Sequence, residues 1–572
     1  MDRATSQTHV DVSRPYVRPT IPAHVDLRLD ANEGPPPARA ILDAVRGAGG
    51  DVLRRYPDGA DTERAFAAYF GVEPESLLMT AGADDAIDRL CRVALSGGGT
   101  LVLPSPSFEM FERYATLAGG RVVRVPWPEG AWPVDAVLDT IDGGTRMVAM
   151  VSPNNPTGAV ASFDALERVA TAHPDVLVVL DHAYAEFADE DLTRRALELP
   201  NVVVLRTMSK AWSLAGLRVG FALGAAERIA PLRAAGPPYA VSQIAVEVAR
   251  AALENARGAM ESTVASVRDE REALTRRAAE LGLRPLPSQA NFVLAGADDP
   301  ARVDRGLQCM GIKIRTWPGH PELDGYVRLG CPADRRAFAR FDRALGSLLR
   351  PGALLLDMDG VIADEGESYR EAIRATLAEF DVEMDRERIA QMKAAGNANN
   401  DWRVTQRLLT EAGIAVDYDE VVARFERHYQ GTDGQPGLHE KETLLVERNV
   451  LEALRARMPL AIVTGRPRRD AIRFLERFEL LDLFDAVVTV DDVARGKPDP
   501  EPVELALSQL GVRTAWMVGD TPDDLVAARA ASVLPIGIGA PSRRDAVSLA
   551  SLDDAGAFTV LDRLADLQEM LP

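Results

Sequence analysis

Cysteine is scarce in this chain: only Cys91, Cys309 and Cys331 occur among its 572 residues. They lie far apart in the sequence and form neither a disulfide framework nor a set of metal ligands, so we expect small buried hydrophobic residues. Apolar runs long enough to cross a bilayer are also missing. Residues 1–16 lack the apolar core of a secretory signal. The sequence therefore predicts a protein of the reducing cytoplasm with no membrane partner.

Basic residues are outnumbered by acidic ones, with 65 Lys and Arg against 86 Asp and Glu, and the formal net charge is −21. This balance argues against nucleic acid as a partner, although a locally basic pocket remains compatible with small anionic substrates. Hydrophobic residues make up 47% of the chain and charged residues 26%, which is ordinary for a globular protein. A chain of 572 residues is too long for one hydrophobic core, so we expect two or three domains.

Short apolar runs alternate with amphipathic stretches along the chain, a pattern that favours an α/β fold with largely parallel sheets. The predicted strands cover residues 100–104, 147–152, 176–181, 202–207, 353–357, 460–465, 486–490 and 515–520. Several of them end in polar residues, and parallel sheets bind ligands at the carboxyl ends of their strands. Residues 244–281, rich in Ala, Glu and Arg, predict one long helix with a solvated face.

A domain boundary is expected near residue 350. Residues 350–352, Arg-Pro-Gly, end one helix, and a new strand follows at once. We therefore predict one domain at residues 1–350 and a second at 351–572, packed closely because the connection is short.

The first group of candidate catalytic residues meets the needs of pyridoxal phosphate. That cofactor requires a lysine for its aldehyde, an acid for its pyridine nitrogen, donors for its phenolic oxygen and an anchor for its phosphate. Lys210 and Asp181 supply the first two, each after a predicted strand. The remaining candidates are Asn155, Tyr184, Ser209, Arg218 and a helix start predicted at residues 82–84. Each is a weak signal alone, and their joint occurrence in this order predicts a cofactor site.

These motifs resemble those of the fold-type I aminotransferases, and within them the histidinol-phosphate aminotransferases, over roughly residues 12–350. The matching segments are RPYVRP (14–19), LDANEG (29–34), RRYPDG (54–59), TAGADDAI (80–87), PSPSFEMF (104–111), SPNNPTG (152–158), DHAYAEF (181–187), SKAWSLAGLRVGF (209–221), PSQANFVL (287–294), IKIR (312–315) and YVRLG (326–330). The resemblance implies a large and a small domain, bound pyridoxal phosphate and a homodimer.

The resemblance also implies a role for each matching residue. Lys210 bonds to the aldehyde of the cofactor and moves the proton between substrate and cofactor, while Asp181 keeps the pyridine nitrogen protonated. The other implied cofactor contacts are Asn155 and Tyr184 at the phenolic oxygen, Phe108 over the ring, and Ser209, Arg218 and the amides of Ala83 and Asp84 at the phosphate. Tyr56 reaches the phosphate bound by the second subunit.

Substrate contacts follow from the same resemblance. It implies that Arg328 binds the substrate carboxylate in a fork geometry. In the histidinol-phosphate branch, Arg315 and Arg328 also receive the substrate phosphate, and Tyr16 lines the side-chain pocket. Two positions depart from the family pattern: residues 31–37 read ANEGPPP, without a second asparagine, and Phe108 stands where tyrosine is common. Both border the substrate pocket, so the identity of the amino acceptor stays open.

A second group of candidate residues suits phosphoryl transfer through an aspartyl phosphate, which needs a nucleophilic carboxylate, an acid/base, Mg²⁺ and a lysine. Asp357 and Asp359 follow a predicted apolar strand, so both emerge at its carboxyl end. Each further candidate also lies beside a strand end: Thr464, Lys497, Asp520 and Asp524. A pair of aspartates alone is common in loops, whereas four such elements in this order predict a phosphatase site.

This second pattern resembles the haloacid dehalogenase superfamily over residues 353–572. The resemblance implies that Asp357 is the nucleophile and that Asp359 protonates the leaving group and then activates water. It implies that Thr464 binds a phosphoryl oxygen and that Lys497 offsets the negative charge. The implied Mg²⁺ ligands are Asp357, Asp520 and the Asp359 carbonyl, with Asp524 supporting them. Residues 363–445 predict a helical cap, from which Lys393, Asn397, Asn399 and Asn400 are candidate contacts.

The two halves suit successive reactions. Transamination of imidazole-acetol phosphate by glutamate gives histidinol phosphate, and a phosphatase converts that product to histidinol. We therefore expect a bifunctional enzyme for small-molecule substrates. Two alternatives remain: the same chemistries on another phosphorylated keto compound, and a decarboxylase in the first half. A third alternative, in which one half is a binding module without catalysis, is disfavoured by the intact Lys210 and Asp357.

Overall fold

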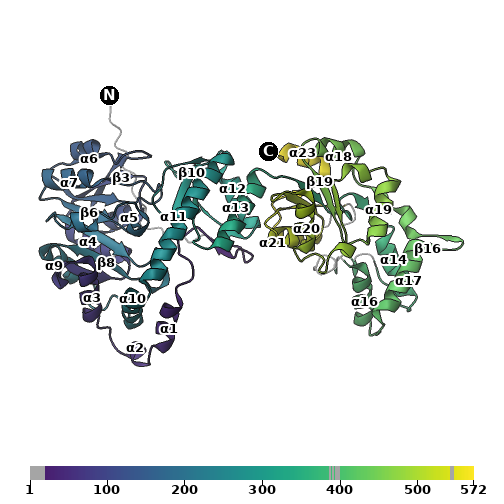
Figure 1. Ribbon diagram of the computed structural model, residues 1–572, viewed down its shortest axis with the longest axis horizontal. Coiled ribbons are helices and arrows are strands. Elements are labelled where there is room, and N and C mark those ends of the chain that lie inside the picture. Colours follow the sequence, from purple (N-terminus) through teal and green to yellow (C-terminus); the bar gives the residue numbers. More distant parts are fainter. Residues whose placement is uncertain (1–19, 386–387, 390–391, 393–399, 541–545, 572) are drawn as a thin grey trace. The chain divides into compact units, whose positions relative to one another are not determined.

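The computed structural model describes residues 20–571 apart from 386–387, 390–391, 393–399 and 541–545. Its contacts divide the chain into two compact units (Figure 1). The first comprises residues 1–20, 28–301 and 314–338, and the second comprises residues 21–27, 302–313 and 339–572. Four predicted substrate contacts, Tyr16, Lys393, Asn397 and Asn399, lie outside the described residues.

A seven-stranded sheet forms the core of the first unit, in the order β2-β8-β7-β6-β5-β3-β4. Strand β8 is antiparallel to both of its neighbours, and the other pairs are parallel. The strands are β2 (Leu77–Thr80), β3 (Thr100–Ser105), β4 (Arg121–Pro126), β5 (Thr145–Val151), β6 (Leu177–Asp181), β7 (Val202–Thr207) and β8 (Gly220–Gly224). Parallel β5, β6 and β7 therefore end at one edge of the sheet.

Helices cover this sheet in two groups. The first group, α4 (Ala83–Leu95), α5 (Met110–Leu117) and α9 (Ala226–Ala235), buries the alternate strand residues of one face. The second group is α6 (Val134–Thr140), α7 (Phe163–Ala172) and α8 (Thr193–Ala196). The unit also contains α1 (Arg39–Gly47), α2 (Asp51–Arg54), α3 (Ala60–Phe70), and an antiparallel sheet in the order β12 (Arg315–Thr316), β13 (Tyr326–Gly330), β10 (Phe292–Gly296) and β9 (Arg284–Pro285).

The single helix predicted over residues 244–281 is wrong. The structure has two helices there, α10 (Gln243–Asn255) and α11 (Arg257–Glu280). Ala256 between them has φ −125° and ψ 12°, outside the helical region. Alanine is a strong helix former, so the break reflects packing: Ala256 is 3% exposed, and Asn255 before it is a weak helix former.

The second unit is built on a six-stranded parallel sheet in the order β20-β19-β14-β21-β22-β23. Its strands are β14 (Leu354–Leu356), β19 (Leu460–Val463), β20 (Ala486–Val488), β21 (Trp516–Gly519), β22 (Leu534–Ile538) and β23 (Val560–Leu561). The helices beside it are α18 (Arg448–Arg455), α19 (Arg468–Arg477), α20 (Glu501–Leu510), α21 (Pro522–Ala530), α22 (Ala546–Asp554) and α23 (Leu567–Met570). All eight predicted strands are thus confirmed, with small shifts at their ends.

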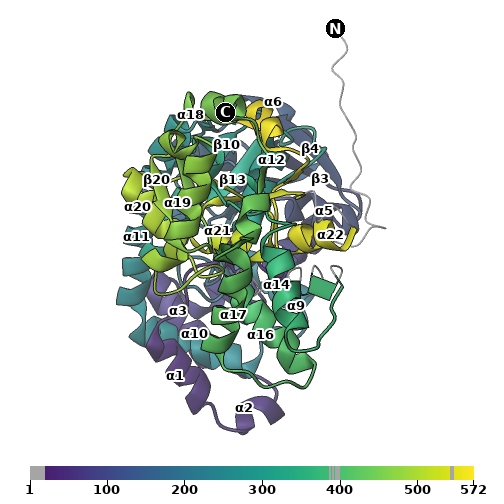
Figure 2. The same cartoon turned by 90° about the vertical axis from the view of Figure 1, so that its right-hand side faces the viewer.

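Between β14 and β19 the chain forms a helical group with a hydrophobic core of its own. Helices α14 (Tyr369–Ala378), α16 (Asp401–Glu411) and α17 (Tyr418–Gln430) pack side by side (Figures 1 and 2). Two short pairs of strands complete it, β15 (Ala363–Asp364) with β18 (Thr443–Leu444) and β16 (Gly431–Thr432) with β17 (Gln435–Pro436). This group is the helical cap that the sequence predicts.

The end of helix α13 (Arg335–Leu349) packs on the six-stranded sheet of the second unit. Ser347 is fully buried there, and its carbonyl oxygen accepts a 2.7 Å hydrogen bond from Nε1 of Trp516 in β21. The Ser347 hydroxyl donates to the carbonyl oxygen of Ser532 at 2.9 Å. Arg302 and Arg305 of α12 (Pro300–Cys309) lie 5.2 and 4.7 Å from the ring centre of Phe558. Residues before the predicted boundary at 350 therefore share contacts with the C-terminal residues.

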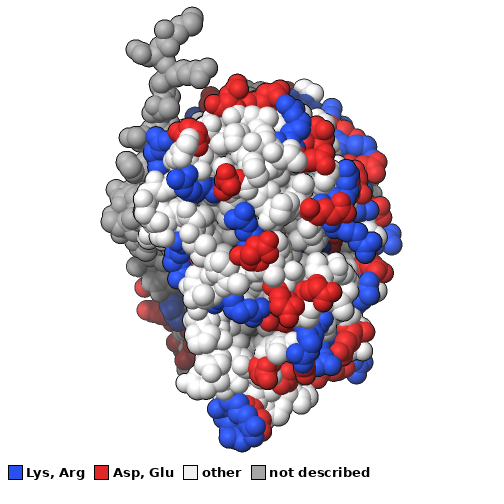
Figure 3. Space-filling model, turned by 90° about the vertical axis from the view of Figure 1, so that its left-hand side faces the viewer, with Lys and Arg blue, Asp and Glu red and all other residues white. Residues whose placement is uncertain are grey.

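Surface charge is mixed on the face that Figure 3 displays, where acidic and basic side chains are interspersed with uncharged surface. Among the described residues, no helix has both the length and the apolar character that a membrane crossing requires. The three cysteines are buried and free, as predicted.

Replacing Trp516 by Phe tests how much the α13 contact contributes. The change leaves the buried carbonyl oxygen of Ser347 without its indole donor, and we expect the second unit to lose about 1–3 kcal/mol of unfolding free energy. Urea unfolding followed by circular dichroism measures it. The control is Trp402→Phe in the same unit, because the indole nitrogen of Trp402 has no hydrogen-bond partner among the described residues. Equal losses in the two variants would contradict the prediction.

Candidate active sites

Strands β5, β6 and β7 place the first set of predicted residues together. Asp181 is the last residue of β6, Asn155 follows β5, and Ser209 and Lys210 follow β7. Lys210 Nζ donates to the carbonyl oxygen of Ala31 at 3.1 Å and lies 5.6 Å from the ring centre of Tyr184. The carboxyl edge of the large sheet thus brings the lysine, the acid and the phenol of the predicted cofactor site together.

Asp181 is 3% exposed and accepts a hydrogen bond from the Ala183 amide at 3.1 Å. Burial raises the pKa of Asp181 to about 7, and the nearby Asp84 carboxylate acts in the same direction, while Lys210 opposes it. A cationic N–H donor beside this carboxyl would restore its ionised form. A protonated pyridine nitrogen is a donor of that kind.

An anion cradle lies at the start of helix α4. Its N-terminal amides carry partial positive charge, and Gly82 before them has φ +81°. This left-handed backbone favours glycine, and a Cβ atom on Gly82 would also lie 2.5 Å from Nη2 of Arg218. Arg218 donates to Asp84 at 3.0 Å and to the Ser209 hydroxyl at 3.4 Å. Two amides, a guanidinium and a hydroxyl converge here, as a phosphate group requires.

Two arginines face each other across the antiparallel sheet. Arg315 of β12 is paired with Arg328 of β13, and their guanidinium groups lie 5.7 and 5.8 Å from the ring centre of Trp317. Arg328 donates 2.6 Å hydrogen bonds to Oδ1 of Asn155 and to the carbonyl oxygen of Asp30. The predicted substrate arginines therefore adjoin the predicted cofactor residues through Asn155.

Two further predicted residues have other surroundings. Phe108 is partly buried and packs against the core of the large sheet. Tyr56 is 79% exposed, and its ring stacks on that of Tyr239 with 4.6 Å between the ring centres. An exposed pair of stacked aromatic rings is a surface that a partner covers readily.

Sequence reasoning missed three residues of this site. Asn32 Nδ2 donates to the Tyr184 hydroxyl at 3.0 Å, and Asn291 donates to the carbonyl oxygen of Asn32 at 3.3 Å. Both asparagines are buried, and their Oδ1 atoms have no hydrogen-bond partner among the described residues. His182 Nε2 accepts from the Leu192 amide at 3.0 Å, so Nδ1 carries the proton and faces the carbonyl oxygen of Ser152. The one sign of these residues in the sequence is that they lie within segments that resemble the aminotransferase motifs.

The residues of the first site therefore fit pyridoxal phosphate. Lys210 offers an amine, Asp181 a buried acid, Tyr184 and Asn155 polar side chains, and the start of α4 an anion cradle. The predicted contacts of Ala83, Asp84, Ser209 and Arg218 all lie in that cradle.

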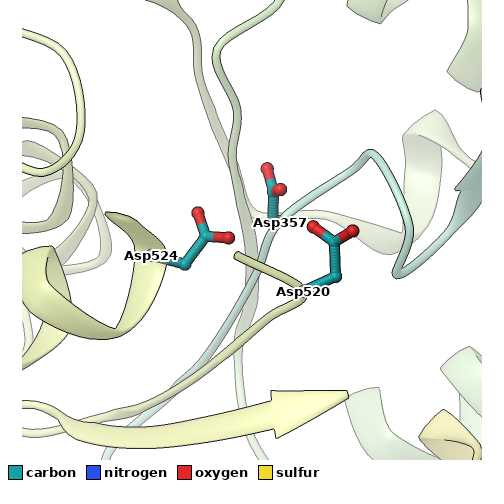
Figure 4. A group of neighbouring side chains, drawn as sticks. All are labelled: Asp357, Asp520 and Asp524. Carbon is teal, nitrogen blue, oxygen red and sulfur yellow. The ribbon is translucent and has the colours of Figure 1, made fainter. Parts of the chain in front are cut away.

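Three buried aspartates meet at the carboxyl edge of the six-stranded sheet. Asp357 follows β14, Asp520 follows β21, and Asp524 lies in the first turn of α21. Their side chains point toward one another, with carboxylate oxygens within 4.8 Å (Figure 4). Gly360 has φ +74°, and a Cβ atom on it would lie 2.2 Å from Oδ2 of Asp520. The glycine of the Asp-Met-Asp-Gly motif thus gives the aspartates room.

Lys497 binds two of these carboxylates. Its Nζ lies 2.8 Å from Oδ1 of Asp357 and 2.6 Å from Oδ1 of Asp524. Burial, together with the charge of Asp524, raises the pKa of Asp357 well above its usual range, and the two carboxylates raise the pKa of Lys497. Three carboxylates and one ammonium leave two formal negative charges, so this donor set fits a hard divalent cation such as Mg²⁺.

Asp359 and Thr464 lie beside this cluster with a residue that sequence reasoning missed. Arg466 donates from Nε and Nη2 to Oδ1 of Asp359, at 2.9 and 2.5 Å. The Arg466 amide donates to Oγ1 of Thr464 at 3.2 Å. Asn400, a predicted substrate contact, caps helix α16 by accepting from the Arg403 amide.

The low number of lysines is a further feature of the sequence that points to the two sites. The chain has only five lysines, at positions 210, 313, 393, 441 and 497, against 60 arginines. Lysine carries a compact amine that can lose its proton, which the guanidinium of arginine does not provide at neutral pH. Lys210 and Lys497 each place such an amine in one of the two sites.

The sites agree with comparisons to known families. Residues 25–335 match the model of the aminotransferase class I and II family, which covers more than half of the chain. The chain belongs to that family. Residues 354–538 match the haloacid dehalogenase-like hydrolase family, and the C-terminal part is a domain of that kind.

Three similar proteins show which members of known families the chain resembles. The chain is 34% identical over 318 residues to a histidinol-phosphate aminotransferase of Granulibacter bethesdensis, covering 53% of this chain and 84% of that protein. It is 38% identical over 281 residues to an aromatic amino acid aminotransferase of Mycolicibacterium paratuberculosis, covering 47% and 78%. It is 42% identical over 237 residues to an imidazoleglycerol-phosphate dehydratase of Phytophthora nicotianae, covering 38% of this chain. The chain spans only about half, 52%, of that last protein.

A solved structure resembles the first part of the chain. It is the histidinol-phosphate aminotransferase of Sinorhizobium meliloti in complex with pyridoxal-5'-phosphate, with a TM-score of 0.52 and 28% identity. The match covers 57% of this chain and 91% of that protein. The predicted fold class, α/β with an aminotransferase part and a haloacid dehalogenase-like part, is confirmed.

The raised pKa of Asp181 predicts a pH-dependent stability in the cofactor-free protein. A carboxyl whose pKa rises on folding stabilises the fold fully below its unfolded pKa of 3.8, and this contribution is lost as pH rises through about 7. Relative to Asp181→Asn, the cofactor-free wild type should lose on the order of 4 kcal/mol of unfolding free energy between about pH 4 and about pH 8. Urea unfolding of both proteins over this range measures the difference, and parallel curves would contradict it.

Replacing Lys497 by Met leaves two buried carboxylates, Asp357 and Asp524, without their ammonium partner. We expect a loss of about 3–5 kcal/mol in unfolding free energy at neutral pH, because an uncompensated buried charge is expensive. Thermal unfolding in EDTA is the measurement, and Lys441→Met, at an exposed position of the same unit, is the control. A wild-type melting temperature for Lys497→Met would show that the ion pairs do not stabilise the fold.

Proposed function

We propose that the chain is a bifunctional enzyme that transaminates a phosphorylated ketone and then hydrolyses the phosphate ester of the product. The proposed substrates are imidazole-acetol phosphate with glutamate, giving histidinol phosphate, which is hydrolysed to histidinol. The observation that carries this proposal is that one chain brings together residues suited to transamination at one sheet edge and residues suited to phosphoryl transfer at another. The names of two similar proteins, a histidinol-phosphate aminotransferase and an imidazoleglycerol-phosphate dehydratase, both belong to histidine biosynthesis and support the pathway.

The paired arginines support a phosphorylated substrate. In transamination, two molecules bind to the same pocket one after the other. The first is an amino donor with a carboxylate, and the second is an amino acceptor of different shape. Arg315 and Arg328, side by side across β12 and β13, provide a fork that binds a carboxylate or a phosphate. Glutamate and a keto phosphate thus share an anionic group that these arginines recognise.

In the proposed transamination, the residues of the first site hold and move protons. Pyridoxal phosphate, when bound, supplies an aldehyde carbon and an electron-withdrawing ring. Asp181 holds the proton at the ring nitrogen, and Tyr184 and Asn155 bind the phenolic oxygen. Lys210 Nζ would take the proton from the substrate Cα and return it to the carbon that comes from the cofactor aldehyde, because an amine can accept and donate a proton in turn.

In the proposed hydrolysis, Asp357 attacks phosphorus as the ester bond to the alcohol breaks. Asp359 gives a proton to the departing oxygen and then takes one from the water that cleaves the aspartyl phosphate. Lys497 and Thr464 bind the charged oxygens. Mg²⁺, when held by Asp357, Asp520, Asp524 and the Asp359 carbonyl, supplies positive charge beside the transferred group.

A homodimer in a reducing cytoplasm completes the proposal. The stacked and exposed rings of Tyr56 and Tyr239 offer an aromatic surface that a second copy would cover. The three buried free cysteines suit a compartment that keeps thiols reduced. Light scattering of the wild type and of Tyr56→Ala tests the dimer.

A second candidate for the amino acceptor is an aromatic keto acid. The similarity to an aromatic amino acid aminotransferase favours it, at 38% identity over 281 residues. In that case the phosphatase half acts on a substrate unrelated to the transamination product. A decarboxylase reaction in the first half is the remaining alternative, and release of CO2 would reveal it.

A one-pot assay with glutamate, imidazole-acetol phosphate, pyridoxal phosphate and Mg²⁺ tests the proposal. We expect 2-oxoglutarate and inorganic phosphate to appear in equal amounts, with histidinol as the product. Lys210→Ala should abolish 2-oxoglutarate formation while hydrolysis of added histidinol phosphate continues, and Asp357→Asn should do the reverse. Persistence of histidinol phosphate in the wild-type reaction would refute the coupled pathway.

A further inference from the structure

Arg466 is the most completely buried cation of the second site, with a side chain that is 1% exposed. It donates twice to Oδ1 of Asp359, at 2.9 and 2.5 Å, and its Nη1 donates to Oε2 of Glu442 at 3.0 Å. The rings of Tyr369 and Phe474 flank the guanidinium, with their centres 5.0 and 5.3 Å from its carbon. One arginine therefore joins the acid/base aspartate to a second, buried carboxylate.

Glu442 is itself fixed by the cap. Its Oε1 accepts from the Ser368 hydroxyl at 2.9 Å and from the Tyr429 hydroxyl at 3.0 Å. Ser368 immediately precedes α14, the first helix of the cap, and Tyr429 lies at the end of α17, its last helix. The first and the last helix of the cap therefore both provide a donor to Glu442, the partner of Arg466.

The Asp359 contact holds one carboxyl oxygen and leaves the other open to the site. Both hydrogen bonds from Arg466 end on Oδ1, and the Asp359 side chain is 23% exposed, so it is not sealed from the site. Oδ2 accepts no hydrogen bond from the described residues and remains available to a leaving-group oxygen. A carboxyl held by one oxygen loses rotational freedom while its other oxygen keeps its function.

We propose that Arg466 is the positioning residue of the phosphatase acid, and that Glu442 makes this positioning depend on the cap. Arg466 orients Asp359 so that its proton passes to the alcohol oxygen as the P–O bond breaks and Asp357 bonds to phosphorus. This inference rests on the proposed hydrolysis at Asp357. It adds a residue that influences which esters are cleaved, because hydrolysis of an ester with a poor leaving group depends on Arg466.

Leaving-group dependence is the readout that separates this role from a structural one. An alkyl alcohol needs a proton as it departs, whereas p-nitrophenol leaves without one. Arg466→Lys should therefore lower kcat on an alkyl phosphomonoester such as propyl phosphate roughly tenfold or more beyond its effect on p-nitrophenyl phosphate. Glu442→Gln keeps the shape and the bonds from Ser368 and Tyr429, and should shift the same ratio in the same direction. Both are measured in the full chain with Mg²⁺.

Non-additivity tests whether Arg466 acts through Asp359. The double variant Arg466→Lys, Asp359→Asn should be no slower on propyl phosphate than Asp359→Asn alone. The control is Arg469→Lys in helix α19, three residues further along the chain, whose 64% exposed side chain pairs with Glu426 at the surface, and it should leave the ester ratio unchanged. Thermal unfolding confirms that each variant is folded, and if Arg466→Lys is not, Glu442→Gln carries the test.

Equal losses on both esters, or additive losses in the double variant, would overturn the positioning role. Failure of the proposed hydrolysis is distinguishable, since Asp357→Asn would then still release phosphate from p-nitrophenyl phosphate.

Discussion

An ionised group buried in a protein needs an opposite charge within a few ångströms, and both sites of this chain are organised by that need. In the phosphatase site, Asp357 and Asp524 share the ammonium of Lys497, while Asp359 and Glu442 share the guanidinium of Arg466. In the aminotransferase site, Asp181 lies deep in the sheet edge beside Lys210, and its proton affinity is raised by burial. The negative charge that the side chains leave unbalanced in each site would be balanced by a bound cation or a protonated cofactor. Such binding would let these carboxylates stay ionised although they are buried.

Parallel strands supply the placement that this electrostatic arrangement needs. A buried strand carries its first polar residue at its carboxyl end, and neighbouring parallel strands bring such residues to one edge. The seven-stranded sheet does so with β5, β6 and β7, and the six-stranded sheet with β14, β19 and β21. The two sites thus use the same structural device in one chain, with Gly82 giving room at the anion cradle and Gly360 giving room at the aspartate cluster.

The sequence was sufficient to predict features that depend on local pattern, such as strands and the polar residues at their ends. Apolar runs located all eight predicted strands, and the ends of those strands located Lys210, Asp181, Asp357 and Asp520. Features set by distant contacts were missed. Arg466 bonds to a residue 107 positions away and Asn32 to one 152 positions away, so no spacing rule finds them. The break at Ala256 was missed because composition along residues 244–281 favours a helix throughout, while packing decides where one helix stops.

Helix α13 has a consequence for how these two catalytic parts have been joined. Its final turn gives Ser347 to the six-stranded sheet, where Trp516 and Ser532 bond to it. Residues 339–349 are therefore part of the folded core of the second unit. A gene divided at the codon for residue 350 would give a phosphatase with an uncovered tryptophan and an aminotransferase with an unburied helix end. A division upstream of α13 would instead keep Ser347 with the sheet that buries it.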